Sequence, residues 1–457
     1  MPQNESSIEI IGKGNIGDKA RQLIEKTPTL RKIGFSTPYR MVLAEDFFNG
    51  FFQKNNIGNS LSDVKNTENL EEKIKRGGLD FDEFLTLKAV SEMHGSFPLV
   101  VRSSAEGDSR GTGTYKSEFC DNEIPQIRKA LTSVLASYFS ESAVAFRRDA
   151  NTGEGFGIII EPLISQNFDS FSAPVISGFG YTSTARGPGY INAVPGIGGG
   201  VDTKDGERIT KDAVKPFKGN LQWYLIEEIG DMCAFNASKV MKKSALLKTD
   251  SGLTLDQDYN CSVYYKSQYF KQHGEICRSS LNLKDLLEKI NILDLFKMMD
   301  KMEKTLKKPQ YFEWAATVEN EKVKYWITQI ADVNKKLDMM DFEDLGEIMF
   351  MGHTVTGTGI KECNKIANCW NPDEVESLYQ FNKENKDYLL IFSSRLTYGG
   401  FGPARKLRYG DFSNAAAFLE IQDARHNGDP VAHLGGQLEL AGKLFGVMDY
   451  DAEVEPN

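Results

Sequence analysis

The hydrophobic and polar positions of the first third of the chain divide it into short apolar runs and amphipathic segments. The run at 8–11 predicts a strand, and the glycine-rich loop after it leads into a helix that begins near Asp18. The apolar run at 98–101 predicts another strand. At 126–148, after Pro125, apolar residues recur at helical spacing, which predicts one long amphipathic helix. Strands that alternate with helices are typical of a mixed α/β fold.

Later parts of the chain carry further apolar runs. Residues 157–164 form a nearly continuous β-branched stretch that fits a buried strand, and Pro162 should end its regular pairing. Such a corner can offer free backbone groups to a flat base, although a core strand is the default interpretation. Strands are also predicted at 177–182 and 388–391. The lysines at 297–308 continue a segment of helical spacing, and we interpret them as a solvated helix face.

The composition is that of a multidomain globular protein. The chain has 457 residues, 40% hydrophobic and 26% charged, so it is long enough for about two or three cores and too apolar to be disordered. Its six cysteines are scattered without a CxxC pair, which leaves zinc and structural disulfides poorly supported. No apolar run approaches a membrane span, and the first residues lack the basic and apolar regions of a leader. We therefore expect a cytoplasmic protein.

The charge balance limits the kind of ligand. A net charge of −10 argues against a general nucleic-acid binder, because binding to a phosphate backbone needs a basic surface. A basic pocket inside an acidic protein remains compatible with this balance. Basic residues that could build such a pocket stand next to glycine-rich loops at two places.

The first place is the run VVRSSAEGDSRGTGTY at 100–115. It delivers Arg102, the hydroxyls of Ser103 and Ser104, and a glycine-rich loop to one point. A guanidinium grips phosphate oxygens in a bidentate way, and exposed N–H groups of such a loop add neutral donors. These groups are the ones needed to hold a polyphosphate. Taken alone, however, the run is explained equally well by a strand followed by a polar turn.

The second place is the loop GKGNIG at 12–17, which leads into the helix that carries Lys19. A lysine at this junction can meet an anion together with the helix N-terminus. The spacing alone favours a capped helix with a surface lysine, because it is not the GxxxxGK[ST] phosphate loop. A further glycine-rich segment at 192–200 fits either a close approach of backbone to a ligand or a flexible lid.

The segment near residue 320 carries the best metal signal. Residues 309–315 and 323–330 are two apolar runs joined by a polar turn, so they predict a hairpin. Glu313 and Gln329 can lie side by side across that pair. A carboxylate beside an amide oxygen, with positions left for phosphate and water, suits magnesium. An exposed acidic residue opposite a glutamine is the alternative, and it is the commoner arrangement.

The order of these motifs resembles the ATP-grasp nucleotide-binding module of pyruvate phosphate dikinase and phosphoenolpyruvate synthase, often called the PEP/pyruvate-binding domain. The likeness is greatest to the stand-alone branch of that family. It rests on the segments IGKGNIGDKARQL, KIGFSTPYRMVLAEDFF, VVRSSAEGDSRGTGTY, IIIEPLI, SGFGYT, AVPGIGGGV and the pair YFEWA and YWITQI. The resemblance implies two lobes that close on Mg-ATP.

The resemblance also implies which residues contact the phosphates. Lys19 matches the lysine of the family's GGKAxxL motif, which contacts ATP phosphates, and this reverses the preference from spacing alone. Arg102 and Ser103 belong to the VRSS motif, whose arginine is a phosphate and transition-state contact. Asp108 matches the acidic position after that motif. Gly113 matches the glycine of the FAGxYxT loop over the triphosphate.

Two further sets of residues take roles from the same resemblance. The segment from Glu161 through Leu163 to Ile164 looks like the hinge that receives adenine through its backbone. Glu313 and Gln329 match the magnesium-binding pair. The implied cofactors are therefore ATP and Mg²⁺.

Three departures from the family pattern weaken the inference of catalysis. Ala331 stands where the QxRP ending has arginine, and Tyr311 replaces an acidic residue that many dikinases carry. Gly199 stands where the GLGE segment has glutamate. Loss of a cation near the transferring phosphate removes charge stabilisation. The resemblance therefore supports ATP binding better than ATP turnover.

The C-terminal part resembles the tail of the stand-alone branch and, through it, the swivelling phosphohistidine domain of the dikinases. The likeness lies in YLLI at 388–391, YGDFSNAAAFLE at 409–420 and DPVAHLGGQ at 429–437. It implies His433 as a catalytic phosphate acceptor, since a neutral imidazole can attack a phosphoryl group and form a covalent carrier. The serine that precedes this histidine in the family is Ala432 here, and a core or helix-start histidine is the favoured alternative.

The sequence thus predicts an α/β (α+β) protein, with a two-lobed ATP-grasp module followed by a small α/β C-terminal domain that resembles a degenerate swivelling phosphohistidine domain. The predicted boundaries are an N-terminal lobe at 1–150, a C-terminal lobe at 151–335, a connecting segment at 336–386 and a small domain at 387–457. The leading function is a Mg-ATP-binding phosphotransferase, a dikinase-like half reaction, that passes phosphate to His433 or to an unknown small-molecule or protein acceptor. The alternatives are a catalytically inactive ATP-binding sensor or partner-organising module, and an ATP-grasp ligase. We expect no nucleic-acid partner and no membrane partner.

Overall fold

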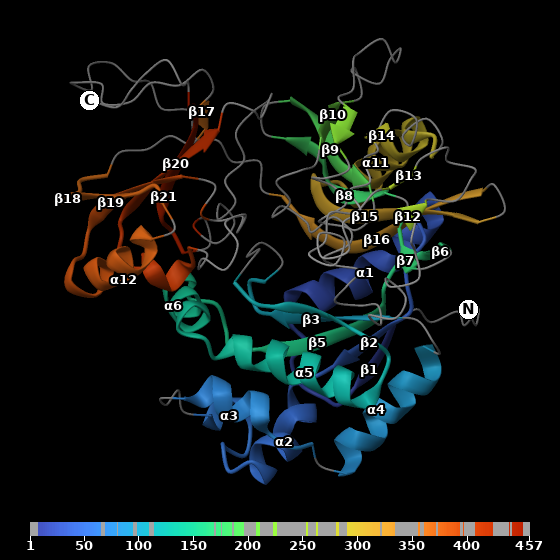
Figure 1. The fold of residues 1–457 in the computed structure, drawn as a ribbon, viewed down its shortest axis with the longest axis horizontal. Coiled ribbons are helices and arrows are strands. Elements are labelled where there is room, and N and C mark those ends of the chain that lie inside the picture. Colours follow the sequence, from blue (N-terminus) through green and yellow to red (C-terminus); the bar gives the residue numbers. More distant parts are fainter. Residues whose placement is uncertain are drawn as a thin grey trace, which may run out of the picture. The chain divides into compact units, whose positions relative to one another are not determined.

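The computed structural model divides the chain into two compact units (Figure 1). Unit 1 comprises Met1–Ser104, Ser117–Ala136 and Gly155–Asn334, and unit 2 comprises Ala105–Lys116, Ser137–Glu154 and Lys335–Asn457. The structure describes residues 8–64, 69–79, 81–94, 98–108, 114–168, 171–174, 176–184, 187–195, 207–210, 223–225, 253–254, 262–263, 280–282, 290–319, 322–333, 355–356, 361–371, 373–393, 396, 407–423, 438 and 441–450. The domain boundaries predicted from the sequence stay predictions.

The first sheet of unit 1 has five strands in the order β1-β2-β5-β3-β4. β1 runs parallel to β2, whereas β2 pairs with β5, and β3 with β4, in antiparallel fashion. The strands are β1 (Ile8–Ile11), β2 (Arg40–Leu43), β3 (Leu99–Ala105), β4 (Ser117–Cys120) and β5 (Phe156–Pro162). The helices are α1 (Gly17–Ile33), α2 (Asn49–Lys54), α3 (Leu70–Arg76), α4 (Phe81–His94) and α5 (Ile124–Tyr138), with 3-10 turns η1 (Glu45–Phe48) and η2 (Leu61–Asp63). The strands predicted near 8–11, 98–101 and 157–164 are confirmed.

The start of α1 is pressed against β3. Gly17 has a φ of +71°, and a Cβ atom at this position would lie 1.9 Å from the carbonyl oxygen of Ser104, so the close approach requires glycine. The Ser104 hydroxyl accepts a hydrogen bond from the N–H of Ala20 at 2.9 Å, which satisfies one free donor of the first helical turn. The N-terminus of α1 is therefore fixed to the strand that carries Arg102.

The second sheet of unit 1 is antiparallel, in the order β10-β9-β8-β15-β16. Its strands are β8 (Ile176–Thr184), β9 (Gly187–Pro195), β10 (Glu207–Thr210), β15 (Gln310–Glu319) and β16 (Lys322–Asp332). Two-stranded pieces pair β6 (Gln166–Phe168) with β7 (Phe171–Ala173), β11 (Trp223–Leu225) with β14 (Ser280–Asn282), and β12 (Leu253–Thr254) with β13 (Ser262–Val263). The predicted hairpin and the predicted strand near 177–182 are confirmed.

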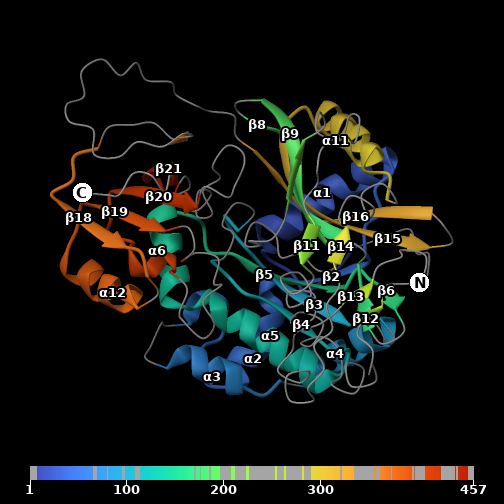
Figure 2. The same ribbon diagram turned by 45° about the horizontal axis from the view of Figure 1, so that its top comes forward.

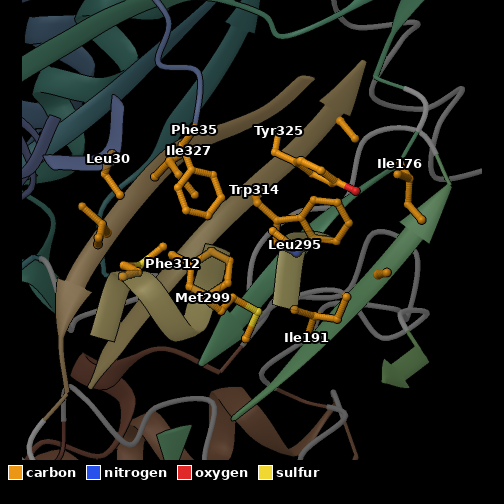
Figure 3. Packing of buried hydrophobic residues seen from close by; sticks show 14 of the residues in the cluster. Leu30, Phe35, Ile176, Ile191, Leu295, Met299, Phe312, Trp314, Tyr325 and Ile327 are labelled. Carbon is orange, nitrogen blue, oxygen red and sulfur yellow. The ribbon is translucent and has the colours of Figure 1, made fainter. Parts of the chain in front are cut away.

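One face of the second sheet forms the main hydrophobic core with α1 and α11 (Ile292–Leu306). Phe312 and Trp314 of β15 lie against Leu295 and Met299 of α11 (Figure 3). All four side chains are at most 2% exposed, so this face is closed by packing. The opposite face of β15 and β16 is left for the polar residues of the candidate site.

Helix α11 presents its lysines to solvent. The lysines of α11 and of the turn after it, at 297, 301, 304, 307 and 308, are exposed, which confirms the predicted solvated face. Among the described residues, no helix has both the length and the apolar character that a membrane crossing requires.

The single long helix predicted at 126–148 is wrong, because the structure has two helices there. These are α5, which ends at Tyr138, and α6 (Glu141–Ala150). The break lies at Ser140, whose hydroxyl accepts a hydrogen bond from the N–H of Ala143 at 3.3 Å and caps the second helix. The apolar spacing continues across this break, so it conceals the new helix start.

Unit 2 is built on a sheet in the order β17-β21-β20-β19-β18. Figure 2 labels the strands β18 to β21 of this sheet. The four strands from β18 to β21 are parallel, and β17 is antiparallel to β21. The core of this unit contains Phe146 of α6 together with Leu378 of α12, Leu390 and Phe418. The elements are β17 (Val355–Thr356), β18 (Lys365–Cys369), α12 (Glu374–Glu384), β19 (Tyr388–Ser393), η5 (Tyr409–Asp411), β20 (Ala417–Asp423) and β21 (Leu444–Tyr450). Both units are mixed α/β, as predicted, and the architecture of unit 1 is consistent with an ATP-grasp-like module.

Candidate functional site

Arg102 lies at the centre of a buried polar cluster in unit 1. Its Nη2 donates hydrogen bonds to Glu313 Oε2 and to Gln329 Oε1, each at 2.7 Å. Its Nη1 donates to the carbonyl oxygen of Thr328 at 2.9 Å and lies 3.4 Å from Glu161 Oε1. One guanidinium therefore links β3, β5, β15 and β16, which belong to both sheets of the unit.

Glu313 and Gln329 are directly opposite each other in the register of β15 and β16, as predicted. Both side-chain oxygens accept a hydrogen bond from the same nitrogen of Arg102, so they converge on one point. A carboxylate oxygen beside an amide oxygen fits a hard cation such as Mg²⁺. In the described part of the chain, no three His, Cys, Asp or Glu side chains form a group that could hold a metal ion. A cation at this pair would therefore need further ligands, such as phosphate oxygens and water.

A β-bulge shapes this part of β16. The register pairs Glu313 with Gln329 and Trp314 with Ile327, so Thr328 is the extra residue. Two consecutive carbonyl groups at the bulge, those of Ile327 and Thr328, both accept hydrogen bonds from buried arginines. In a regular strand successive carbonyls point to opposite edges. The bulge thus turns two backbone acceptors toward the cluster.

The second of these arginines is Arg40, which the sequence analysis missed. Its Nε donates to Glu161 Oε2 at 2.7 Å, and its Nη2 donates to the carbonyl oxygen of Ile327 at 2.6 Å. The side chain of Arg40 is fully buried and that of Glu161 is 3% exposed. Glu161 therefore lies between two arginines and bridges them. The only signal for Arg40 in the sequence was its place at the start of the otherwise apolar strand RMVL. An arginine at that place is typical of an ordinary strand end.

The carboxylates dominate the electrostatics of the cluster. Burial alone would lower the pKa of Arg102, but Glu313 and Glu161 outweigh it and raise that pKa above its ordinary value. At Arg40 burial prevails over the attraction of Glu161 and lowers the pKa. Both guanidiniums are charged, because an arginine side chain is not deprotonated in proteins. Two arginines thus balance two glutamates.

The other residues predicted to contact phosphate are only partly described. Lys19 in the first turns of α1 and Ser103 in β3 are both buried. Asp108 is also buried and belongs to unit 2. Gly113 and His433 lie outside the described residues, as does Gly199, so their predicted roles stay predictions.

The predicted adenine hinge follows the end of β5. The strand ends at Pro162, as predicted, and the N–H of Leu163 donates to the carbonyl oxygen of Pro98 at 2.8 Å. Leu163 and Ile164 are 6% and 5% exposed. The N–H of Leu163 is therefore already engaged. Glu161 adds a side chain that points to the arginines, a role that the backbone prediction did not include.

Aromatic and small side chains continue the cluster along β15 and β16. Tyr311 is opposite Ala331 in the register, and its hydroxyl donates to Glu313 Oε1 at 3.2 Å. Burial and the charge of Glu313 raise the pKa of Tyr311 well above its ordinary value, so the phenol stays protonated. Its ring centroid lies 5.2 Å from that of Tyr181 and 6.2 Å from that of Phe179. A phenol and a methyl group thus occupy two positions where the family pattern has an acid and an arginine.

Comparison with known proteins gives the family of this part of the chain. The chain matches the family described as pyruvate phosphate dikinase, AMP/ATP-binding domain, over residues 14–341. The match spans well over half of the chain and includes every residue of the Arg102 cluster. Curated proteins give no match. The motif resemblance is therefore confirmed, and the chain belongs to the pyruvate phosphate dikinase AMP/ATP-binding domain family.

Proposed function

We propose that the chain binds Mg-ATP at the Arg102 cluster and acts as a phosphotransferase in a dikinase-like half reaction. The observation that carries the proposal is the convergence of Glu313 Oε2 and Gln329 Oε1 on Arg102 Nη2, each at 2.7 Å. A permanent cation and a pair of oxygen ligands meet at one buried point. These are the two parts that phosphoryl transfer requires, because catalysis of this reaction rests on positioning and charge stabilisation.

The residues of the chain would divide the work as follows. Arg102 would bind phosphate oxygens, exchanging a hydrogen bond to Glu313 or Gln329 for one to the nucleotide. The freed oxygens of those two side chains would hold magnesium, which when bound supplies charge neutralisation at the phosphates. Lys19 and Ser103 would add phosphate contacts beside the N-terminus of α1.

The hinge after β5 would receive the adenine. Because the N–H of Leu163 donates to Pro98, the remaining backbone groups from Glu161 to Ile164 are the candidates for contact with the base. A buried, apolar surrounding at Leu163 and Ile164 suits a flat ring.

The phosphate acceptor is the least constrained part of the proposal. His433 is the candidate within the chain, and an unknown small molecule or protein is the other. The nucleophile would be a neutral imidazole nitrogen. In-line attack at the γ-phosphorus would form a phosphohistidine and release ADP, whereas attack at the β-phosphorus would form a pyrophosphohistidine and release AMP.

A second candidate function is ATP binding without turnover, as a sensor or as a module that organises a partner. The specific observation in its favour is Ala331, which is 3% exposed and lies on β16 two residues after Gln329. A methyl group there cannot stabilise the charge of a transferring phosphate as the family's arginine would.

Labelling separates the two functions. ATP binding is first measured by calorimetry in magnesium buffer, and then β- and γ-labelled ATP are tested for transfer to the protein. Phosphotransfer predicts an acid-labile, base-stable label that His433→Ala abolishes and the matched variant His426→Ala retains. Tight binding without label or ATP consumption favours the sensor. A chain that binds no ATP would exclude both functions.

A further inference from the structure

Arg40 is a buried cation that lies within the segment KIGFSTPYRMVLAEDFF, and the family resemblance assigns it no role. It sits at the start of β2 and is fully buried. Two of its nitrogens are engaged by Glu161 and by the carbonyl oxygen of Ile327, whereas Nη1 has no hydrogen-bond partner among the described residues. A buried guanidinium is costly unless it is paired, so its retention calls for a compensating interaction.

The charge count of the cluster identifies that interaction. Glu161 and Glu313 bring two negative charges, and Arg102 alone would leave the buried cluster with one negative charge in excess. A net negative cluster would repel a polyphosphate at the point where the nucleotide is proposed to bind. Arg40, paired with Glu161 at 2.7 Å, brings the balance to zero.

The geometry assigns the two arginines different partners. Arg40 is 2.7 Å from Glu161, whereas Arg102 is 3.4 Å from Glu161 and 2.7 Å from Glu313. Glu161 therefore pairs mainly with Arg40, and Arg102 is directed toward β15 and β16. Without Arg40, the buried carboxylate of Glu161 would draw Arg102 toward itself.

Arg40 also holds the bulge of β16. Its bond to the carbonyl oxygen of Ile327 is supported by backbone hydrogen bonds of Ser36, which lies just before β2. The N–H of Ser36 donates to the carbonyl oxygen of Tyr325 at 2.7 Å, and the carbonyl oxygen of Ser36 accepts from the N–H of Ile327 at 3.1 Å. The segment that carries Arg40 is thus fixed to the strand that carries Gln329.

We propose that Arg40 is a positioning residue for the phosphates of the nucleotide, which neutralises Glu161 so that Arg102 stays directed at Glu313, Gln329 and the incoming phosphate. This inference rests on the proposed ATP site. It gives the chain a second permanent positive charge in the cluster, supplied from β2.

The test compares a charged ligand with an uncharged one. Calorimetry measures the affinity of ATP, of inorganic tripolyphosphate and of adenosine for the wild-type chain, Arg40→Met, Glu161→Gln and the double variant. Arg40→Met is expected to weaken the binding of ATP and of tripolyphosphate by about tenfold or more, and to change the affinity for adenosine by less than about twofold. The double variant restores neutrality and should recover most of the phosphate affinity.

The other variants protect the test against misfolding. Glu161→Gln alone leaves the cluster with an excess positive charge and should tighten tripolyphosphate binding, which a loss of structure cannot produce. Lys26→Met removes another buried cation bonded to β15 and β16 and should leave the ratio of ATP to adenosine affinity unchanged.

Each outcome decides the inference. If Arg40→Met lost affinity for ATP and for adenosine equally, or if the double variant recovered no phosphate affinity, Arg40 would have only a structural role. Wild-type affinity for tripolyphosphate in Arg40→Met would also overturn it, while leaving the ATP site intact. A wild-type chain that binds neither ATP nor tripolyphosphate would overturn the proposed function and this inference together.

Discussion

Two buried cations of unit 1, Lys26 and Arg102, both contact strands β15 and β16, but their surroundings differ. Lys26 of α1 donates to Gln310 Oε1 at 2.8 Å and to Asp332 Oδ1 at 2.6 Å. The amide nitrogen of Gln310 donates in turn to Asp332 Oδ1 at 2.9 Å. The polar atoms of this Lys26 cluster thus satisfy one another at the ends of β15 and β16.

The Arg102 cluster is satisfied less completely. Within the described chain, Gln329 Nε2 and Arg40 Nη1 are buried donors without an acceptor. Buried polar groups are normally paired, and an unpaired donor costs free energy, so these two donors do not add to stability. The comparison teaches that the two clusters differ in how completely their polar atoms are paired, which fits a structural role for the Lys26 cluster and supports the proposed ligand-binding role of the Arg102 cluster.

The largest expected effect is the loss of nucleotide binding in Arg102→Met. Charged hydrogen bonds contribute about 1.5–3 kcal/mol each, so removal of this guanidinium should weaken ATP by about 100-fold or more. The same variant leaves Glu313 and Gln329 without their cation. It should therefore bind Mn²⁺ in the absence of nucleotide, measured by electron paramagnetic resonance, where the wild-type chain does not.

The gain of Mn²⁺ binding has its own control. Arg102→Met combined with Glu313→Gln removes the carboxylate ligand and should abolish the gain. If Mn²⁺ binds the double variant equally well, or if Arg102→Met retains ATP affinity, the Arg102 cluster is not the phosphate and cation site.

The next effect is on stability and comes from the Lys26 cluster. Lys26→Met leaves the carboxylate of Asp332 without its main partner, and because that carboxylate is 25% exposed we expect a loss of about 2 kcal/mol in the free energy of unfolding. Urea denaturation measures the loss, and ATP affinity should not change. The matched control is Lys297→Met, whose pair with Asp294 is exposed and should contribute less than about 0.5 kcal/mol.

The opposite result would remove the distinction between the clusters. A Lys26→Met variant that lost ATP affinity while keeping its stability would show that both clusters serve binding.

Local patterns were sufficient to predict much of the Arg102 cluster. The apolar run before Arg102 and the two runs around Glu313 and Gln329 fixed strand positions, and the alternation of a hairpin then placed the last two residues opposite each other. The family motifs pointed to the same residues. The predictions of these strands and of the hairpin pairing are confirmed, because each depends on residues close together in the sequence.

Arg40 and the bulge at Thr328 could not be predicted in the same way. Arg40 meets Glu161 across 121 positions and Ile327 across 287, and no spacing in the sequence connects such distant partners. A bulge depends on how a strand pairs with its neighbour, so the sequence of β16 alone does not reveal the extra residue. The helix break at Ser140 was hidden for a related reason, since a serine within an apolar period can either cap a helix or continue one.

The smallest expected effect is the pH dependence that Asp332 gives to stability. Burial alone would raise its pKa, but hydrogen bonds from Lys26 and Gln310 prevail and lower it to about 2, from an ordinary value of 3.8. The folded protein therefore binds this proton less tightly than the unfolded chain. The stabilisation is present above pH about 4 and is lost as the pH falls toward 2.

The size of this effect is limited by the partner. Burial lowers the pKa of Lys26 in spite of Asp332, so part of the attraction only offsets the cost of burying the lysine. Because Asp332 is partly exposed, we expect its charge to contribute about 1 kcal/mol to the free energy of unfolding.

Urea denaturation of the wild-type chain and of Asp332→Asn at several pH values isolates this carboxylate from the others. The gap in unfolding free energy between the wild-type chain and Asp332→Asn should narrow from pH 5 to pH 2.5. When both chains also carry Lys26→Met, the gap should be smaller at every pH. A gap that stays constant would show that the Lys26 cluster does not hold a charged Asp332, and the contrast with the Arg102 cluster would then rest on binding alone.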